Sequence, residues 1–257
     1  MILSDPDSPE VAIWQLVESC GYTADLPAWS EITGNAGSAG GIAAVLDLGC
    51  GIGRVARHLA AEGRVVVGVE VDPHLAADLN RLSADERVSA VTGSATDLAS
   101  LDLGQDRFEA IIAPQQLLHI VGGKLSRGAL LEGVRQRLSP DGTAAFAISE
   151  WIPEDSRQVD VLPDVREIGE WVYASRPVAV EDDGDSLTVI CLRQVVAPDG
   201  SLQESHDRIT LDRMDRHMLN DELAEAGLAV ERTIEIPETD RHIATVIVVA
   251  RHKAGNP

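Results

Sequence analysis

The chain has 257 residues, of which 42 are acidic and 21 are Lys or Arg, so its formal net charge is -21. Its 44% hydrophobic residues are ordinary for a folded globular protein, and a surface this acidic argues against nucleic acid or an anionic membrane as partner. No apolar run is long enough for a membrane span, and the first ten residues lack a signal-peptide pattern. The three cysteines show neither metal-ligand nor disulfide spacing, so we expect a cytoplasmic protein without a metal site.

The first element predicted along the chain is a helix that follows Pro9, with Asp7 or Ser8 as its cap. Its apolar stripe consists of Ile13, Leu16, Val17 and Cys20. This spacing of i, i+3, i+4 and i+7 places the four side chains on one helical face. The Gly-, Ala- and Ser-rich segment 34–41 predicts a loop.

From residue 42, short apolar runs alternate with helical patterns of about ten residues. The predicted strands are 42–48, 64–69, 88–91, 108–113 and 143–149. The predicted helices are 54–62, 72–82 and 125–138. Strands that alternate with helices in this way favour a parallel sheet covered on both faces.

After Trp151 the pattern changes to longer strands in which polar and apolar residues partly alternate. The predicted elements are strands 171–175, 187–196 and 202–211, helix 216–226, and strands 228–236 and 242–250. The first three form an antiparallel meander of roughly 55 residues, inserted into the α/β frame. We therefore predict three parts: an N-terminal helical segment and loop at 1–41, an α/β domain at 42–150 and 212–257, and a lid at 151–211.

The most informative motif is a glycine loop between the first strand and the next helix. Gly49, Gly51 and Gly53 follow closely after Asp47, and glycine permits both a tight turn and close approach of a ligand. The helix start behind the loop offers free N–H groups. Glu70 lies 21 residues after Gly49, at the end of the next strand, where an acid can accept both hydroxyls of a ribose.

A dinucleotide fingerprint reads GxGxxG, whereas this loop reads GxGxG after an acid. It resembles motif I of the class I S-adenosylmethionine-dependent methyltransferases. The resemblance covers roughly residues 42–150 and 216–250, and includes the segments 68–70, 93–97 and 112–114. It implies a Rossmann-like, doubly wound, mostly parallel seven-stranded sheet with an antiparallel last strand and an antiparallel β lid. It also implies S-adenosylmethionine as cofactor.

The resemblance assigns cofactor contacts to residues that follow the first four strands. The methionine part would be held by Asp47, Gly49, Cys50, Gly51 and Gly53. Glu70 would bind the ribose, and the adenine would contact Val71 and Ala95, with Thr96 or Asp97. Ala113 and Pro114 would lie beside the sulfonium. Cys50 reads as a small residue that fills the loop. Ser94 replaces the acid that usually follows Gly93, which weakens the adenine contact expected there.

Catalytic candidates follow the fourth strand, because methyl transfer needs alignment first and a base only where the nucleophile must lose a proton. His119 is either this base or a histidine at a helix start, and Gln115 and Gln116 either position substrate or cap that helix. The lid candidates for substrate contact are Trp171, Tyr173 and Arg193. Strand alternation directs only about half of a strand's side chains inward.

The resulting functional expectation is methyl transfer to a nitrogen, oxygen or carbon atom of a small molecule, in natural-product biosynthesis. One alternative keeps the fold and replaces methylation by ring closure or elimination. Another is a non-catalytic partner subunit. The edge of the inserted sheet is compatible with a homodimer or a heterodimer.

Overall fold

The computed structural model describes residues 10–19, 21–34, 44–83, 87–152, 162–239 and 242–253. The proposed cap before residue 10, Cys20, and most of the segment 34–41 lie outside these residues. None of the helices within the described ranges combines the length and apolar character that a bilayer span requires.

The helices and strands follow one another along the chain in the order that the sequence predicts, with four additions. The helices are α1 (Glu10–Glu18), α2 (Leu26–Thr33), α3 (Arg54–Ala61), α4 (Pro73–Leu82), the 3₁₀ helix η1 (Ala95–Ser100), α5 (Leu117–Ile120), α6 (Gly123–Arg137) and α7 (Arg216–Glu225). The strands of the large sheet are β1 (Ala44–Leu48), β2 (Val65–Glu70), β3 (Val88–Thr92), β4 (Phe108–Ala113), β5 (Leu138–Ile148), β10 (Leu228–Ile236) and β11 (Thr245–His252). The strands of the small sheet are β6 (Asp164–Ile168), β7 (Trp171–Asp182), β8 (Ser186–Val196) and β9 (Leu202–Asp212).

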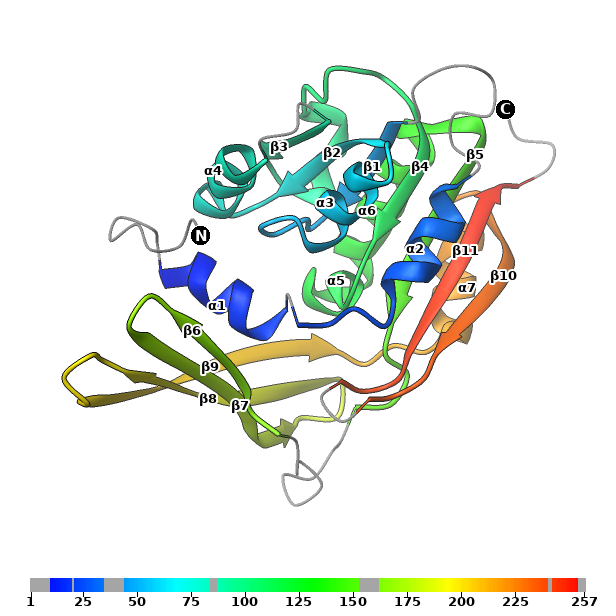
Figure 1. The fold of residues 1–257 in the computed structure, drawn as a ribbon. Coiled ribbons are helices and arrows are strands. Elements are labelled where there is room, and N and C mark those ends of the chain that lie inside the picture. The colour runs from blue at the N-terminus through cyan, green and yellow to red at the C-terminus, as the bar shows by residue number, and fades with distance from the viewer. Residues whose placement is uncertain are drawn as a thin grey trace.

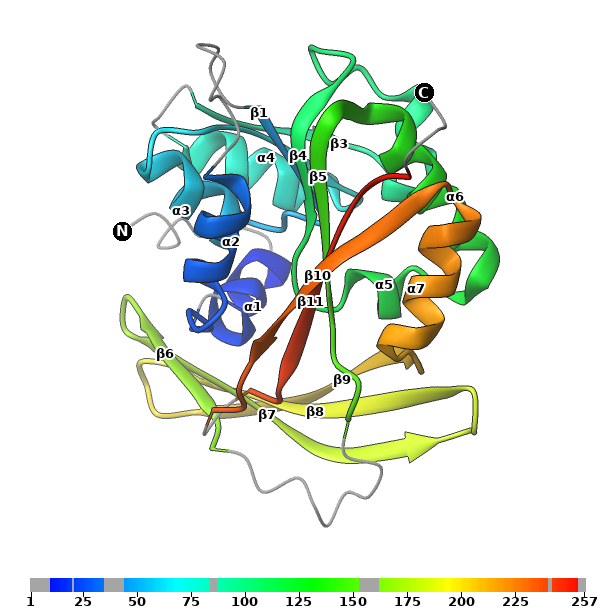
Figure 2. The ribbon, with the colours of Figure 1, turned by 90° about the vertical axis from the view of Figure 1, so that its right-hand side faces the viewer.

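The large sheet has the strand order β10-β11-β5-β4-β1-β2-β3. The strands from β5 to β3 are parallel, whereas β11 runs antiparallel to both β5 and β10. Helices α2, α3 and α4 cover one face, and α6 and α7 cover the other (Figure 2). The predicted Rossmann-like, doubly wound sheet with an antiparallel last strand is thereby confirmed.

The second sheet is an antiparallel meander in the order β6-β7-β8-β9, and it lies across one end of the molecule (Figure 1). It differs from the prediction in two ways. β6 was not predicted, because its five residues include three charged ones. β7 continues past residue 175, because a bulge between Pro177 and Ala179 absorbs the proline, which has no N–H to donate.

The remaining unpredicted helices, α2, η1 and α5, are short. The signal for α2 is Pro27 in its first turn, the same signal that correctly located α4 after Asp72. Helix α2 buries Trp29, whose indole N–H donates to Asp25 Oδ2 at 2.8 Å. Two of the predicted helices have recognisable caps: Asp72 accepts from the first turn of α4, and Gly227 follows the end of α7 with φ +79.

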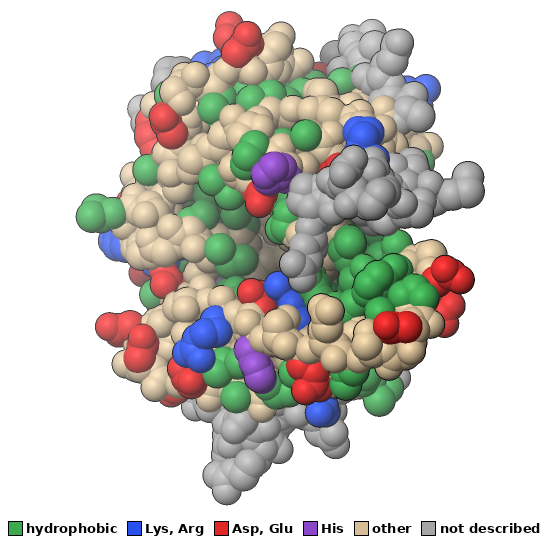
Figure 3. Space-filling view, turned by 90° about the vertical axis from the view of Figure 1, so that its left-hand side faces the viewer, with side chains coloured by type: hydrophobic (Ala, Val, Ile, Leu, Met, Phe, Trp, Pro, Cys, Tyr) green, Lys and Arg blue, Asp and Glu red, His purple; other side chains and the backbone are tan. Residues whose placement is uncertain are grey.

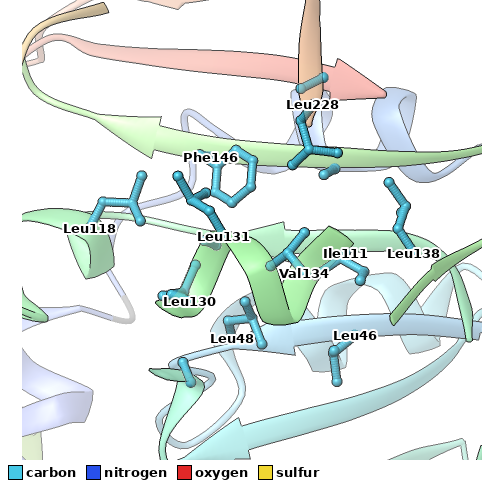
Figure 4. Close-up of a cluster of buried hydrophobic side chains, with 14 of the residues drawn as sticks. Leu46, Leu48, Ile111, Leu118, Leu130, Leu131, Val134, Leu138, Phe146 and Leu228 are labelled. Carbon is cyan, nitrogen blue, oxygen red and sulfur yellow. The ribbon is translucent and has the colours of Figure 1, made fainter. Parts of the chain in front are cut away.

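The main core lies between the large sheet and helices α6 and α7 (Figure 4). Its fully buried side chains include Leu46, Leu48, Ile111, Leu130, Leu131, Val134 and Phe146. Alternate residues of β1 and β4 point to this face, and residues of α6 one turn apart pack against them. The core thus fixes the carboxyl ends of the central strands, where the glycine loop begins.

A buried ion-pair network joins α6, α7 and the end of the lid. Arg127 donates through Nε and Nη2 to the Glu222 carboxylate, at 2.8 Å from Nη2, and through Nη1 to Asp212 Oδ2 at 2.6 Å. Arg127 is 4% exposed and Glu222 is 7% exposed. Each charge is therefore costly to leave alone but well compensated by the others.

Replacing Arg127 by Ala is expected to lower the free energy of unfolding by about 3–5 kcal/mol, because it leaves two carboxylates without their partner. Lys124→Ala is the matched control on the same helix, since Lys124 pairs with Glu225 at the surface. Urea denaturation measures both variants. Equal midpoints for the two variants would contradict the importance of the buried network.

Candidate active site

A cavity of about 480 Å³ lies beyond the carboxyl ends of the central strands. Strand β1 lies between β2 and β4, and the strand order reverses direction at β1: β2 and β3 follow on one side, β4 and β5 on the other. This reversal is the topological switch point of the sheet. Open α/β sheets bind ligands at such a switch point, because the loops diverge there and leave a crevice. Figure 3 shows the hollowed face of the molecule, between the α/β part and the small sheet.

The glycine loop forms one wall of this cavity. Gly49, Gly51 and Gly53 have φ values of +66, +54 and +85, a region that side chains strongly disfavour. A Cβ on Gly53 would lie 2.3 Å from Leu79 Cδ1, so glycine is also required there by packing. Gly53 then caps α3, and the free N–H groups of the first turn of this helix lie beside the cavity.

Asp47 is the deepest acid of the site, with 1% of its surface exposed. It lies at the end of β1, lines the cavity, and its Oδ1 has no hydrogen-bond partner within the described part of the chain. Burial raises the pKa of Asp47 to about 7; Arg54 opposes this rise and the charge of Glu70 adds to it. A cationic group placed beside Oδ1 would offset this cost.

Glu70, at the end of β2, also lines the cavity and is 8% exposed. Its Oε2 accepts from the Gly51 N–H at 2.9 Å, and its Oε1 accepts from the Asp72 N–H at 3.0 Å. A carboxylate has further lone pairs, so the same group can still accept hydroxyl hydrogens. The two backbone bonds fix its orientation.

Arg54 is a site residue that the sequence reasoning missed. It lines the cavity directly after the glycine loop, and it binds Asp25 through two hydrogen bonds of 2.6 and 2.8 Å. The guanidinium also lies over the ring of Tyr22. Its position next to the loop was the available signal, but the partner is 29 residues away and cannot be read from spacing.

The other proposed cofactor residues divide into two groups. Those that line the cavity are Gly49, Cys50, Val71, Ala95, Thr96 and Pro114, and Ser94 joins them. Those outside the lining are Gly51, Gly53, Asp97 and Ala113.

Asp97 is exposed and accepts a hydrogen bond from the Ser100 hydroxyl. Ser94, where an acid was expected, instead caps η1 through the Thr96 N–H. Burial raises the pKa of the Cys50 thiol, so the neutral thiol fills the loop as expected.

His119 is 1% exposed and does not belong to the cavity lining. Its Nε2 accepts from the Ser149 N–H at 3.1 Å, which places the ring proton on Nδ1, 2.8 Å from the Asp212 carbonyl oxygen. Burial lowers the pKa of His119 and keeps the ring neutral. Both nitrogens are thus occupied by backbone groups, and the side chain connects α5 to β5 and to the end of the lid.

Gln115 and Gln116 line the cavity after β4, close to Pro114. Gln115 has φ +55, and it is the one non-glycine residue with positive φ in the described ranges. Such strain persists only where the surroundings enforce it, often at functional sites. These two residues therefore share one wall of the cavity with Pro114.

The three lid candidates, Trp171, Tyr173 and Arg193, do not line the cavity. Tyr173 packs edge-on against Trp14 of α1, and Arg193 binds Glu18 of α1. The cavity wall on this side comes from α1 itself, through residues that the sequence reasoning did not select, Gln15 and Ser19. No local motif marks these two, because their role arises from how α1 packs.

The strand order and the glycine loop are those of the class I S-adenosylmethionine-dependent methyltransferase fold. Residues 45–142 match the family described as a methyltransferase domain. A dTDP-3-amino-3,6-dideoxy-alpha-D-glucopyranose N,N-dimethyltransferase from Streptomyces fradiae is 29% identical over 192 residues, which are 74% of this chain and 71% of the relative.

Solved structures agree in fold. An amino pentose methyltransferase of calicheamicin biosynthesis from Micromonospora echinaspora has a TM-score of 0.71 at 20% identity, with 94% of this chain and 97% of that chain covered. A methyltransferase from Streptomyces caelestis has a TM-score of 0.68 at 21% identity, with 94% and 96% covered. The chain thus carries a methyltransferase domain at residues 45–142, in the fold of the class I S-adenosylmethionine-dependent methyltransferases.

Replacing Glu70 by Gln is expected to weaken binding of S-adenosylhomocysteine by at least about 1 kcal/mol, because a charge-assisted acceptor is lost. Isothermal titration calorimetry measures the dissociation constant. Asp106→Asn is the control, since Asp106 is an exposed acid just before β4, at the opposite edge of the sheet. A folded Glu70→Gln variant with the wild-type constant would remove Glu70 from the site.

The dissociation constant of S-adenosylhomocysteine is expected to fall as pH rises from about 5.5 to about 7, by up to about tenfold per pH unit. Below its pKa of about 7, Asp47 is protonated and must lose its proton before it can pair with the ligand ammonium. The free protein should respond in the opposite sense: its raised pKa means that stability falls as pH rises from the unfolded value of about 4 towards 7. Asp47→Asn should remove the contribution of Asp47 to both slopes, and an affinity slope that is unchanged by this substitution would contradict the assignment.

Proposed function

We propose that this methyltransferase methylates the amino nitrogen of an amino sugar or a similar small polar molecule. The proposal is supported by the relative at 29% identity, which is an amino-sugar N,N-dimethyltransferase, and by the neighbour that is an amino pentose methyltransferase. The observation that carries it within this chain is the cavity that begins at Asp47 and Glu70 and continues to Gln115 and Gln116.

The residues present fit S-adenosylmethionine, which supplies a methyl group on a sulfonium for in-line transfer to a nucleophile. Asp47, buried and with an unpartnered oxygen, provides a place for the ammonium of the methionine part. Glu70, already oriented by two backbone N–H groups, accepts the ribose hydroxyls. Ser94, Ala95 and Thr96 border the adenine side of the cavity.

The acceptor end of the cavity is polar but carries no net charge of its own. Gln115 and Gln116 offer amide oxygens that accept from an amine N–H and so direct its lone pair toward the methyl group. Leu117 and Ile120 add apolar side chains to the same wall. A neutral amine is itself a nucleophile, so these residues act mainly by alignment.

The test is a methylation assay with the purified chain, S-adenosylmethionine and an amino sugar, with the matching hydroxy sugar as the control acceptor. We expect mass spectrometry to show a gain of one or two methyl groups on the amino sugar alone. Methylation of the hydroxy sugar in preference would contradict N-methylation. A chain that binds S-adenosylhomocysteine yet methylates neither acceptor would contradict this substrate class.

A further inference from the structure

Helix α1 lies between the small sheet and the glycine loop (Figure 1), and presents different side chains to each. Gln15 and Ser19, one turn apart, line the cofactor cavity. Gln15 reaches over the loop, since a Cβ on Gly51 would lie 2.8 Å from Gln15 Oε1. Trp14 and Glu18, also one turn apart, face the lid. Helix α1 therefore connects the lid mechanically to the cavity.

The contact between α1 and the lid is a two-point ion pair. Arg193 donates from Nε and from Nη2 to the two oxygens of Glu18, at 2.7 Å each. The Ser175 hydroxyl donates to Glu18 Oε1 at 2.8 Å. Arg193 is itself held by Asp207 at 3.0 Å and lies 4.9 Å over the Trp14 ring. Such a planar, two-point pair fixes orientation as well as distance.

The pair is shielded, since the Glu18 side chain is 23% exposed and the Arg193 side chain is 18% exposed. The other end of α1 is held differently: Ala12 packs against Ile52 of the glycine loop and Leu75 of α4. A nine-residue helix is marginal without tertiary contacts. Apolar packing therefore anchors the first turn, and the ion pair sets the position of the last turn.

We propose that Glu18 is a positioning residue of the methyl-transfer site: its pair with Arg193 holds Gln15 over the glycine loop and closes the cofactor cavity. Glu18 does not itself belong to the described cavity lining, so it acts through Gln15. The lid contributes to cofactor binding by this route, although Tyr173 and Arg193 do not reach the cavity. The role rests on the proposed function, because it takes the cavity as the S-adenosylmethionine site.

The test is a double-mutant cycle with Glu18→Gln, Gln15→Ala and the double variant, titrated calorimetrically with S-adenosylhomocysteine. Each single variant is expected to raise the dissociation constant about five- to tenfold. The double variant should bind about as weakly as the weaker single variant, because both remove the same contact. In the methylation assay, Glu18→Gln should raise KM for S-adenosylmethionine more than it lowers kcat.

The matched control is Glu181→Gln, which breaks an exposed ion pair with Arg208 in the same sheet and should leave the dissociation constant unchanged. Losses that multiply in the double variant would show that Glu18 does not act through Gln15, and would overturn the proposal. A lower Tm for Glu18→Gln with unchanged affinity would overturn it too. In both cases the wild-type chain would still bind S-adenosylhomocysteine, so the cofactor site would remain supported. A wild-type chain that binds no S-adenosylhomocysteine would overturn the cofactor site together with the role of Glu18.

Discussion

The carboxylate of Glu70 holds the turn on which the rest of the site depends. The loop after β1 is left-handed at three glycines; its Gly49 and Cys50 N–H groups donate to the Val69 carbonyl of β2, and the buried N–H of Gly51 also needs a partner. Glu70 accepts from the loop at Gly51 and from the start of α4 at Asp72, and so joins the ends of two paired strands. Because the same carboxylate faces the cavity, the residue proposed to bind the ribose also orders the backbone of the loop.

This arrangement concentrates negative charge in a buried place. Asp47 and Glu70 lie near each other behind the glycine loop, and the one nearby cation, among the cavity-lining residues described, is Arg54, which is bound to Asp25. Burial is the main cause of the raised pKa of Asp47, and the charge of Glu70 adds to it. Under the proposed function, a cationic ligand group beside Asp47 would offset the cost of this burial. Two of the acids that contribute to the net charge of -21 are thus buried at the cavity, and composition alone could not locate them there.

Polar contacts join the lid to the rest of the chain at two places. At the end of β9, Asp212 binds Arg127 and accepts from His119. Within β8, Arg193 binds Glu18 of α1. His119, placed near the methyl group by sequence, therefore serves the packing of the lid, while the cavity wall comes from α1. The cavity wall that follows β4 carries two glutamines, one of them with a strained backbone.

The sequence by itself determined the alternating strands, the glycine loop, and the positions of Asp47 and Glu70 at strand ends, because each depends on backbone preferences or on the local pattern of apolar residues. Only the tertiary structure decided which side chains meet. Gln15 faces the loop because α1 packs there, and the ring nitrogens of His119 bind backbone groups 30 and 93 residues away. Such pairs leave no periodic signal, since they depend on the packing of whole elements. The division of the chain into an N-terminal segment, an α/β domain and a lid stays a prediction, and the presence of two separate sheets agrees with it.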